Sequence, residues 1–243
     1  MKSIYTILTL LITSLALTAI TPEEIIRRME ANEVHDSAYS EGRMITTDKY
    51  GTIVRSFNSW TMGEENALIE FTSAGEKGQK ILRTENEIYL YFPDAAEVLR
   101  IQGSAMRDSV MDSDFSYEDM TGDKGLLDDY SARLIGEELI DGRESYAVEL
   151  IAEKRSVPYY KQIIWIDKER FVGLRNHKFS RSGRLLKEME VLEYENRQGK
   201  IIPVRMVMRD KMKKDSSTEF IIDTLNLDAD IDPSLFSLEE LTW

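Results

Sequence analysis

Cysteine is absent from the 243 residues of this chain, histidine occurs twice and proline five times. Without cysteine the protein can form no disulfide bond and offers no thiol for lipid attachment after a leader. The sequence also lacks the G-x-S-x-G, G-x-G-x-x-G, P-loop and H-E-x-x-H motifs on which serine hydrolases, nucleotide-binding enzymes and zinc proteases depend. We therefore expect no enzyme activity, no catalytic residue and no cofactor.

Positive charge is scarce: 31 Lys and Arg residues face 44 Asp and Glu, which gives a net charge of -13. A surface of this sign repels phosphate backbones and anionic bilayers, so we expect no nucleic-acid partner and no general attraction to such a bilayer. Attraction to a basic partner surface stays open, although a solvated acidic surface explains the charge equally well.

The chain has only one long apolar run, at its start. Lys2 precedes an apolar stretch at residues 4–17 that is interrupted by Thr and Ser and followed by small residues. This layout is typical of a secretory signal peptide, and the stretch is shorter than the ~20 apolar residues that span a bilayer. We interpret residues 1–19 as a signal peptide. Residues 20–243 are then expected to form one domain in the periplasm, as a monomer without a lipid anchor.

Signal cleavage is the first testable expectation. We predict cleavage between Ala16 and Ile20, because Ile20 and Ile25 lie at the spacing of a hydrophobic staple at the start of a helix. Intact-mass measurement of protein from the periplasm checks this. A mature chain that still begins at Met1 would contradict both the cleavage and the localisation.

A helix is predicted directly after the signal peptide. Thr21 is placed as its N-cap, Pro22 occupies the first helical position and Glu24 has capping-box spacing. An apolar stripe of Ile25, Ile26 and Met29 follows, so we expect the helix to lie on a sheet and to end near Asn32.

Most of the remaining chain shows the alternation of strands, broken by turns every eight to twelve residues. The expected strands are 39–47, 52–62, 67–72, 79–84, 88–92, 97–101, 130–139, 145–152, 159–166, 171–179, 185–194, 201–208 and 218–227. Consecutive strands without interleaved helices predict a mainly β fold with a meandering antiparallel sheet. Pro203 indicates that its strand is either an edge strand or bulged.

Residues 104–129 interrupt this pattern. Met106, Val110 and Met111 recur at roughly helical spacing, which predicts a helical flap. Ser116 and Asp119 have the spacing of a capping box, so a second short helix is predicted to begin at Tyr117.

The same region carries a resemblance to a known family. The stretch LYFPDAAEVLRIQGSAMRDSVMDSDFSYEDM resembles a segment of the LolA-like outer-membrane lipoprotein-sorting proteins, the LolA/LolB/RseB-type half-barrels. The matching positions are Phe92, Pro93, Arg100, Ile101, Gly103, Ser113, Asp114, Phe115, Ser116, Tyr117, Glu118 and Asp119. A looser likeness extends to a Pro-x-x-Phe element at Pro233 and Phe236.

The resemblance implies a curved, incomplete antiparallel β-barrel whose apolar hollow is covered by helices and takes up acyl chains. The implied function is a periplasmic carrier or chaperone of lipids or acylated lipoproteins. Its implied partner is a lipoprotein-release transporter or an inner-membrane exporter of the resistance-nodulation-division type. The alternative is a ligand-sensing or protein-interaction module on the same fold, similar to envelope-stress regulators.

Apolar residues of the strands and the flap are the candidate lipid-binding residues. They are Trp60, Phe71, Leu90, Phe92, Met106, Val110, Met111, Phe115 and Met120. The residues alone favour an ordinary packed core, since core and pocket use the same side chains. The resemblance and the flexible methionines of the flap favour a cavity.

Acidic residues and histidines suggest other sites only weakly. Carboxylates cluster at Asp108, Asp112, Asp114, Glu118 and Asp119, which could in principle bind calcium or act as an acid–base pair. Capping already explains Asp119, and an EF-hand-like run at 228–239 has Pro233 where the loop needs Gly. We interpret His35 and His177 as structural or surface residues, and we expect no metal site.

Overall fold

The computed structural model describes residues 20–33, 35–63, 65–84, 87–121, 125–155 and 157–242. The interpreted signal peptide lies outside the described residues. Helix α1 (Pro22–Glu33) begins as predicted: the Thr21 hydroxyl accepts a hydrogen bond from the Glu24 N–H at 3.2 Å. The Glu24 carboxylate pairs with Arg28 at 2.7 Å instead of closing the capping box.

The predicted strands are all present, and each overlaps one strand of the structure. They are β1 (Ser37–Asp48), β2 (Gly51–Met62), β3 (Asn66–Phe71), β4 (Lys80–Thr84), β5 (Glu87–Phe92), β6 (Glu97–Ile101), β7 (Tyr130–Ile140), β8 (Arg143–Ala152), β9 (Lys161–Asp167), β10 (Gly173–Phe179), β11 (Leu185–Arg197), β12 (Lys200–Asp210) and β13 (Ser217–Leu227).

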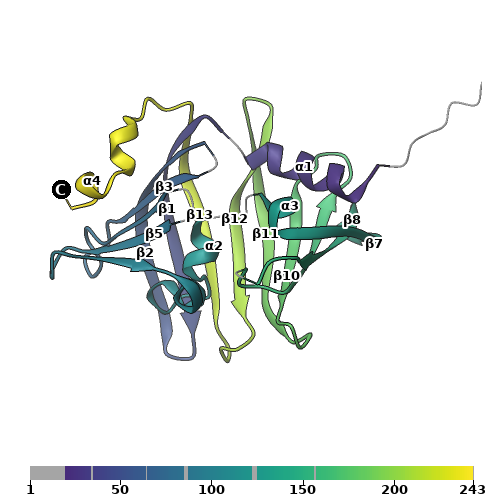
Figure 1. Ribbon diagram of the computed structural model, residues 1–243, viewed down its shortest axis with the longest axis horizontal. Coiled ribbons are helices and arrows are strands. Elements are labelled where there is room, and N and C mark those ends of the chain that lie inside the picture. The colour runs from purple at the N-terminus through teal and green to yellow at the C-terminus, as the bar shows by residue number, and fades with distance from the viewer. Residues whose placement is uncertain are drawn as a thin grey trace, which may run out of the picture.

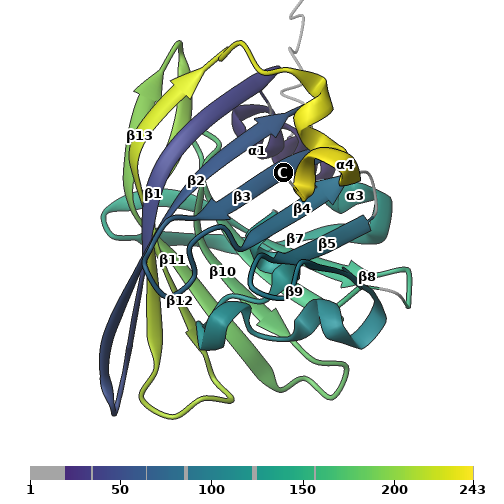
Figure 2. The ribbon, with the colours of Figure 1, turned by 90° about the vertical axis from the view of Figure 1, so that its left-hand side faces the viewer.

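Within the described ranges these strands form a single antiparallel sheet of 13 strands, in the order β6-β5-β4-β3-β2-β1-β13-β12-β11-β10-β9-β8-β7. The first and last strands of the chain pair with each other in the middle of the sheet. The sheet curves without closing, so that β2 to β5 lie in front of β8 and β9 when the molecule is seen from the side (Figures 1 and 2). The expected incomplete barrel is confirmed.

Strand order forces the middle of the chain across the sheet. β6 and β7 follow each other in sequence but lie at opposite edges, so residues 102–129, the crossover segment, must run from one edge to the other. It contains η1 (Gly103–Arg107), η2 (Val110–Asp112), α2 (Tyr117–Thr121) and α3 (Leu126–Asp129). The helix predicted at Tyr117 is therefore confirmed. The preceding part forms two 3-10 segments instead of a regular helix. In the second of them, Met111 and Asp112 adopt positive φ values of 49° and 60°, which no regular helix contains.

Apolar residues divide the inner face of the sheet, which contacts α1 and the crossover segment, into two clusters. In one, Phe57, Phe71 and Leu90 pack with Val110 and Phe115 of the crossover segment. In the other, α1 and α3 pack on β8 and β9; its buried members are Ile25, Ile26, Met29, Leu126, Tyr130, Val148, Leu150, Ile164 and Ile166. The helices thus cover one curved face.

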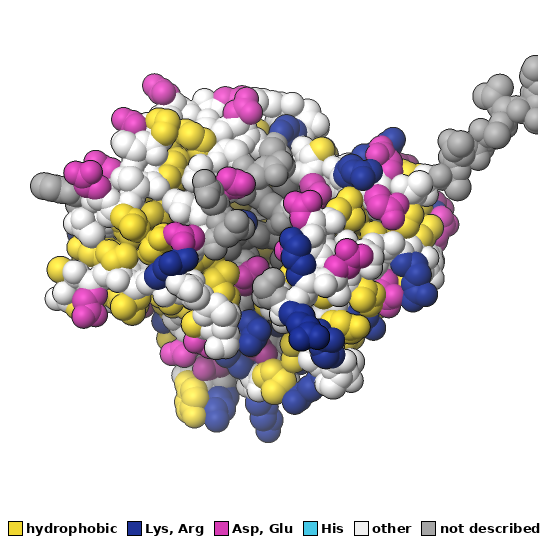
Figure 3. Space-filling view, in the orientation of Figure 1, with side chains coloured by type: hydrophobic (Ala, Val, Ile, Leu, Met, Phe, Trp, Pro, Cys, Tyr) yellow, Lys and Arg dark blue, Asp and Glu magenta, His cyan; other side chains and the backbone are white. Residues whose placement is uncertain are grey.

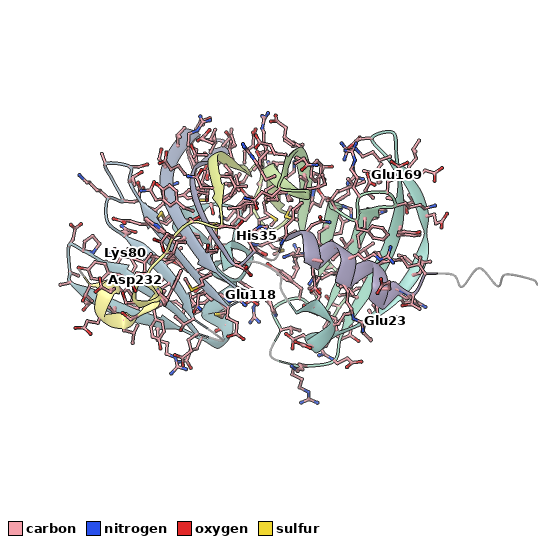
Figure 4. The ribbon with its side chains drawn as sticks, turned by 90° about the horizontal axis from the view of Figure 1, so that it is seen from above. Glu23, His35, Lys80, Glu118, Glu169 and Asp232 are labelled. Atoms are coloured by element: carbon pink, nitrogen blue, oxygen red, sulfur yellow. The ribbon has the colours of Figure 1, made fainter. Side chains whose placement is uncertain are left out.

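The C-terminal segment covers part of the outer face. η3 (Pro233–Phe236) and α4 (Leu238–Leu241) bring Phe236 and Leu241 onto Leu68 and Leu82 of β3 and β4. Seen from above, this segment and Asp232 lie beside Lys80, the first residue of β4 (Figure 4). The outer face of this half of the sheet is therefore also packed.

Pro203 lies in a central strand, so the edge-strand alternative is wrong and the bulge alternative is right. It stands opposite Tyr194, where the register between β11 and β12 shifts twice. β12 pairs with β13 only from Arg205 to Met208. The absence of an N–H on Pro203 therefore costs no ladder hydrogen bond to β13, from which β12 has already separated.

Gly42 lies on β1 in the middle of the sheet, where atoms of β2 and β13 approach its Cα closely. A Cβ atom there would lie 2.4 Å from the Ile221 carbonyl oxygen and 2.6 Å from the Phe57 ring. We expect Gly42→Ala to lower the free energy of unfolding by about 1–3 kcal/mol through overpacking. Gly136→Ala is the matched control, since a Cβ in that strand meets no heavy atom within 4 Å. Equal urea midpoints for the two variants would contradict the prediction.

Candidate functional site

The motif residues of the crossover segment hold α2 in place. The Asp119 N–H donates to the Ser116 hydroxyl at 3.3 Å, and the Ser116 N–H donates to an Asp119 carboxylate oxygen at 2.9 Å. This reciprocal arrangement is the predicted capping box. The Ser116 hydroxyl also lies 2.7 Å from the same carboxylate oxygen.

Asp119 does more than cap a helix, because it joins the crossover segment to the sheet. Its side chain is only 1% exposed and receives the Lys178 ammonium at 2.9 Å and the Lys187 ammonium at 2.7 Å. These lysines are register partners on β10 and β11, and both are buried. The Tyr159 hydroxyl lies 3.1 Å from each oxygen of the same carboxylate.

Two opposing effects act on the pKa of Asp119. Burial raises it, while the charges of Lys178 and Lys187 and the hydrogen bonds from Lys187 and Ser116 lower it. The lowering wins, so the pKa of Asp119 lies well below its usual range and the carboxylate is ionised at neutral pH.

Asp114, which directly precedes Phe115 in the chain, forms a second anchor between the crossover segment and the sheet. Its fully buried carboxylate accepts hydrogen bonds from the Asp210 N–H at 2.9 Å and from the Ser216 and Thr218 hydroxyls at 2.8 Å. The Lys187 ammonium also donates to the Asp114 carbonyl at 2.8 Å. Asp114 thus ties the crossover segment to the end of β12 and the start of β13, while Asp119 ties it to β10 and β11.

A cavity of about 250 Å³ lies under this anchored segment, between the two apolar clusters. Its lining comes from α1, α2, α3, the Phe115 region and strands β9 to β13. The lining residues are Met29, Phe115, Asp119, Met120, Leu126, Ile164, Gly173, Arg175, Asn176, Lys178, Met189, Val191, Pro203, Met206, Met208 and Phe220. Five methionines in this wall make it both apolar and adaptable.

Two buried polar atoms of lining residues, Asn176 Oδ1 and Arg175 Nε, have no hydrogen-bond partner among the residues that the structure describes. The Asn176 side chain is buried, and its Nδ2 donates to Gln162 at 2.8 Å. Its Oδ1 has no hydrogen-bond partner within the part of the chain that the structure describes. A buried acceptor in a cavity wall can bind a donor on a ligand or a water molecule.

The predicted lipid-binding residues fall into several places. Phe115 and Met120 line the 250 Å³ cavity. A smaller hollow of about 60 Å³ is lined by five others: Phe71, Leu90, Phe92, Val110 and Met111. Met106 packs against the cluster around Phe57, while Trp60 lies on the outer face, beside Leu68 and Leu82, with its ring centroid 5.5 Å from that of Tyr39.

Sequence reasoning missed the cavity wall that comes from the second half of the sheet. Met189, Met206 and Met208 lie on the inner face of β11 and β12, and none of them is among the predicted lipid-binding residues. Lys178 and Lys187 could have indicated this wall, because each falls at a position of its strand that alternation places on the buried face. A buried lysine without a counter-charge is costly, so each predicts a buried carboxylate partner.

Comparison with known proteins identifies the family. A family model with the description "Uncharacterized protein" matches residues 63–243. A DUF1329 family protein from Desulfovibrio piger, whose crystal structure is known, shares 26% sequence identity with this chain. The two structures superpose with a TM-score of 0.84, covering 90% of this chain and 96% of that one. A LolA superfamily protein from Nitrosomonas europaea is 23% identical, with a TM-score of 0.77 over 91% of this chain and 100% of that one.

The chain belongs to the family that this model describes, and it has the LolA-like fold. A putative outer-membrane lipoprotein-sorting protein domain from Vibrio parahaemolyticus shares the fold of this LolA-like chain, with 22% identity and a TM-score of 0.84 over 90% of this chain and 97% of that one. The search of curated proteins found no match.

The acidic motif of this LolA-like protein is built for anchoring. Asp114 and Asp119 are engaged by the sheet, while Asp108 and Asp112 are exposed. Among the described residues no group of three or more His, Asp or Glu side chains is arranged to hold a metal ion. None of the described helices is long and apolar enough to cross a membrane.

We expect Asp119→Asn to lower the free energy of unfolding by about 3–5 kcal/mol, because two buried ammonium groups lose their counter-charge. Urea unfolding at neutral pH measures the loss. Asp112→Asn is the control: it makes the same chemical change at an exposed residue of the same segment, and we expect an effect within about 0.5 kcal/mol. Similar losses in the two variants would contradict the anchoring role.

The pH dependence of this loss gives a further prediction. The pKa of Asp119 is lower in the folded state than in the unfolded chain, where it is about 3.9. The stability that the ionised carboxylate contributes is therefore fully present above the unfolded-state pKa, and it is lost as the pH falls through the folded-state pKa. The stability difference between the wild type and Asp119→Asn should therefore shrink as unfolding is measured at successively lower pH below about 4. A difference that stays constant there would assign the loss to another cause.

Proposed function

We propose that this LolA-like protein is a periplasmic carrier that binds the acyl chains of lipids or lipoproteins without covalent chemistry. The observation that carries the proposal is the methionine-rich cavity on the inner face, roofed by a segment of chain that is tied to the sheet at Asp114 and Asp119. The lipoprotein-sorting description of the similar Vibrio parahaemolyticus domain supports it. No catalytic group is required.

Cavity size limits what the present conformation can hold. A volume of about 250 Å³ falls just below the ~300–1,000 Å³ of ordinary ligand sites. A single short acyl chain is therefore the natural occupant. Each buried methylene contributes ~0.8 kcal/mol, so ten of them supply ~8 kcal/mol before the cost of immobilisation, a micromolar affinity at most.

Larger cargo requires the crossover segment to move. Val110 and Phe115 belong to the same cluster as Leu90, beside the 60 Å³ hollow. We infer that displacing these two residues would enlarge the binding space toward Phe71 and Leu90, on the other half of the sheet. In this proposal the anchors at Asp114 and Asp119 set the cost of opening, and a lipoprotein-release transporter or a resistance-nodulation-division exporter loads or receives the cargo.

Met206 is the best position at which to block the cavity. It lines the wall between Val191 and Phe220 on neighbouring strands, so we expect Met206→Trp to fill the space and reduce binding of a fluorescent fatty acid at least tenfold. Circular dichroism should show an unchanged fold, because the indole enters empty volume. Met212→Trp introduces the same side chain at a turn residue that is 54% exposed, and this variant should bind like the wild type.

Two outcomes would count against the carrier. Wild-type protein that binds no fatty acid and carries no lipid in native mass spectrometry would remove its support. Equal binding by the wild type and a folded Met206→Trp variant would place the acyl chain elsewhere.

A further inference from the structure

A second, differently built pocket lies where strands β8 to β11 end, away from the methionine wall. Its volume is about 290 Å³. It is formed by η1, the loop between β8 and β9, and the turn between β10 and β11. The lining residues are Arg107, Ala152, Lys154, Arg155, Val157, Pro158, Tyr160, Ser180, Arg181 and Leu186.

Charge sets this pocket apart from the rest of the surface. Four of its lining residues are cationic and none is acidic, in a chain whose net charge is -13. Figure 3 shows Lys and Arg side chains grouped on the lower part of the visible face, where the hairpin turns of Figure 1 lie. Excess of one sign within one pocket focuses the field and attracts an ion of the opposite sign.

The arginines of the pocket also differ from arginines elsewhere in how they are paired. Most others have a carboxylate within salt-bridge distance; examples are Arg43 with Asp223 at 2.7 Å and Arg209 with Glu190 at 2.9 Å. Lys154 likewise pairs with Asp129 at 2.7 Å.

Arg107, Arg155 and Arg181 have no carboxylate within 4.0 Å among the residues that the structure describes. Arg181 is positioned instead by Tyr160, with its guanidinium 4.5 Å from the ring centroid. Three guanidinium groups gathered at one pocket in an acidic protein lack the anion that would balance them.

We propose that this pocket binds a phosphate group, either as inorganic phosphate or as the headgroup phosphate of a lipid. The guanidinium fork matches phosphate oxygens through paired hydrogen bonds, which is why arginine is the preferred side chain at such sites. Val157, Pro158 and Leu186 supply an apolar border that suits a phosphate carried on a larger amphiphile. The site is separate from the acyl cavity and does not depend on that cavity binding a lipid.

Arg107 gives phosphate binding a structural consequence. It belongs to η1 of the crossover segment, whereas Arg155 and Arg181 belong to loops at the ends of the sheet strands. A phosphate held by all three would connect the crossover segment to the sheet at a third point, besides Asp114 and Asp119. Ligand binding to the folded protein should then raise its unfolding midpoint.

The experiment is isothermal titration calorimetry of the full chain with two probes: inorganic phosphate, and a short-chain phosphatidylglycerol below its critical micelle concentration. Each titration is run at low salt and again at about 0.15 M salt. The test variant is Arg155→Glu with Arg181→Glu. The control is Arg184→Glu with Lys214→Glu, which makes the same charge change at exposed turn residues outside the pocket lining. Circular dichroism verifies that both variants are folded.

We expect the test variant to lose at least tenfold in affinity, and the control to lose less than twofold at 0.15 M salt. Equal affinities for both probes identify the phosphate group itself as the ligand, and binding of the lipid alone identifies a headgroup site. Equal losses in the two variants would mean diffuse surface attraction and would overturn the proposal. Wild-type protein that binds neither probe would overturn it as well, whatever the fatty-acid experiment shows.

Discussion

The buried contact of one carboxylate with two lysines holds the architecture of this protein together. Asp119 lies on the crossover segment, while Lys178 and Lys187 lie on adjacent strands of the inner face. Removing two ammonium groups from water is costly unless a counter-charge and hydrogen bonds compensate them. The lysines therefore require the crossover segment to dock, and the docked segment covers the inner face.

Docking at this point produces a covered hollow instead of a filled core. The polar anchors contact the ends of β10 and β12 and the starts of β11 and β13. The helices α1 and α3 occupy the face of β8 and β9. Apolar side chains of α2 and the neighbouring strands border the space left between them, with Met120, Met189 and Met206 in the wall. Flexible thioether side chains adapt to a variable guest more readily than branched ones. Rigid polar anchors around an adaptable apolar wall suit non-covalent uptake.

The motif at Ser116 and Asp119 in the crossover segment shows which contacts a local sequence pattern can predict and which it cannot. Its spacing is sufficient to predict a capping box at Ser116 and Asp119, and both reciprocal hydrogen bonds are present. The same carboxylate also receives two lysines that follow it by 59 and 68 residues. No local sequence pattern predicts that Asp119 pairs with these two lysines, because the pairing depends on which strands lie under α2. Capping was thus a correct but partial explanation.

By itself, the sequence determined the strands, the first helix and the helix at Tyr117, because alternation, capping residues and turn residues act over a few neighbouring positions. Tertiary structure alone decided the strand order, which pairs β1 with β13 and sends residues 102–129 across the inner face. It also decided that Met206 lines a cavity while Trp60 lies on the outer face. The physical reason is that a cavity is a space between elements far apart in the chain, and an apolar residue carries the same pattern whether it borders that space or fills a core.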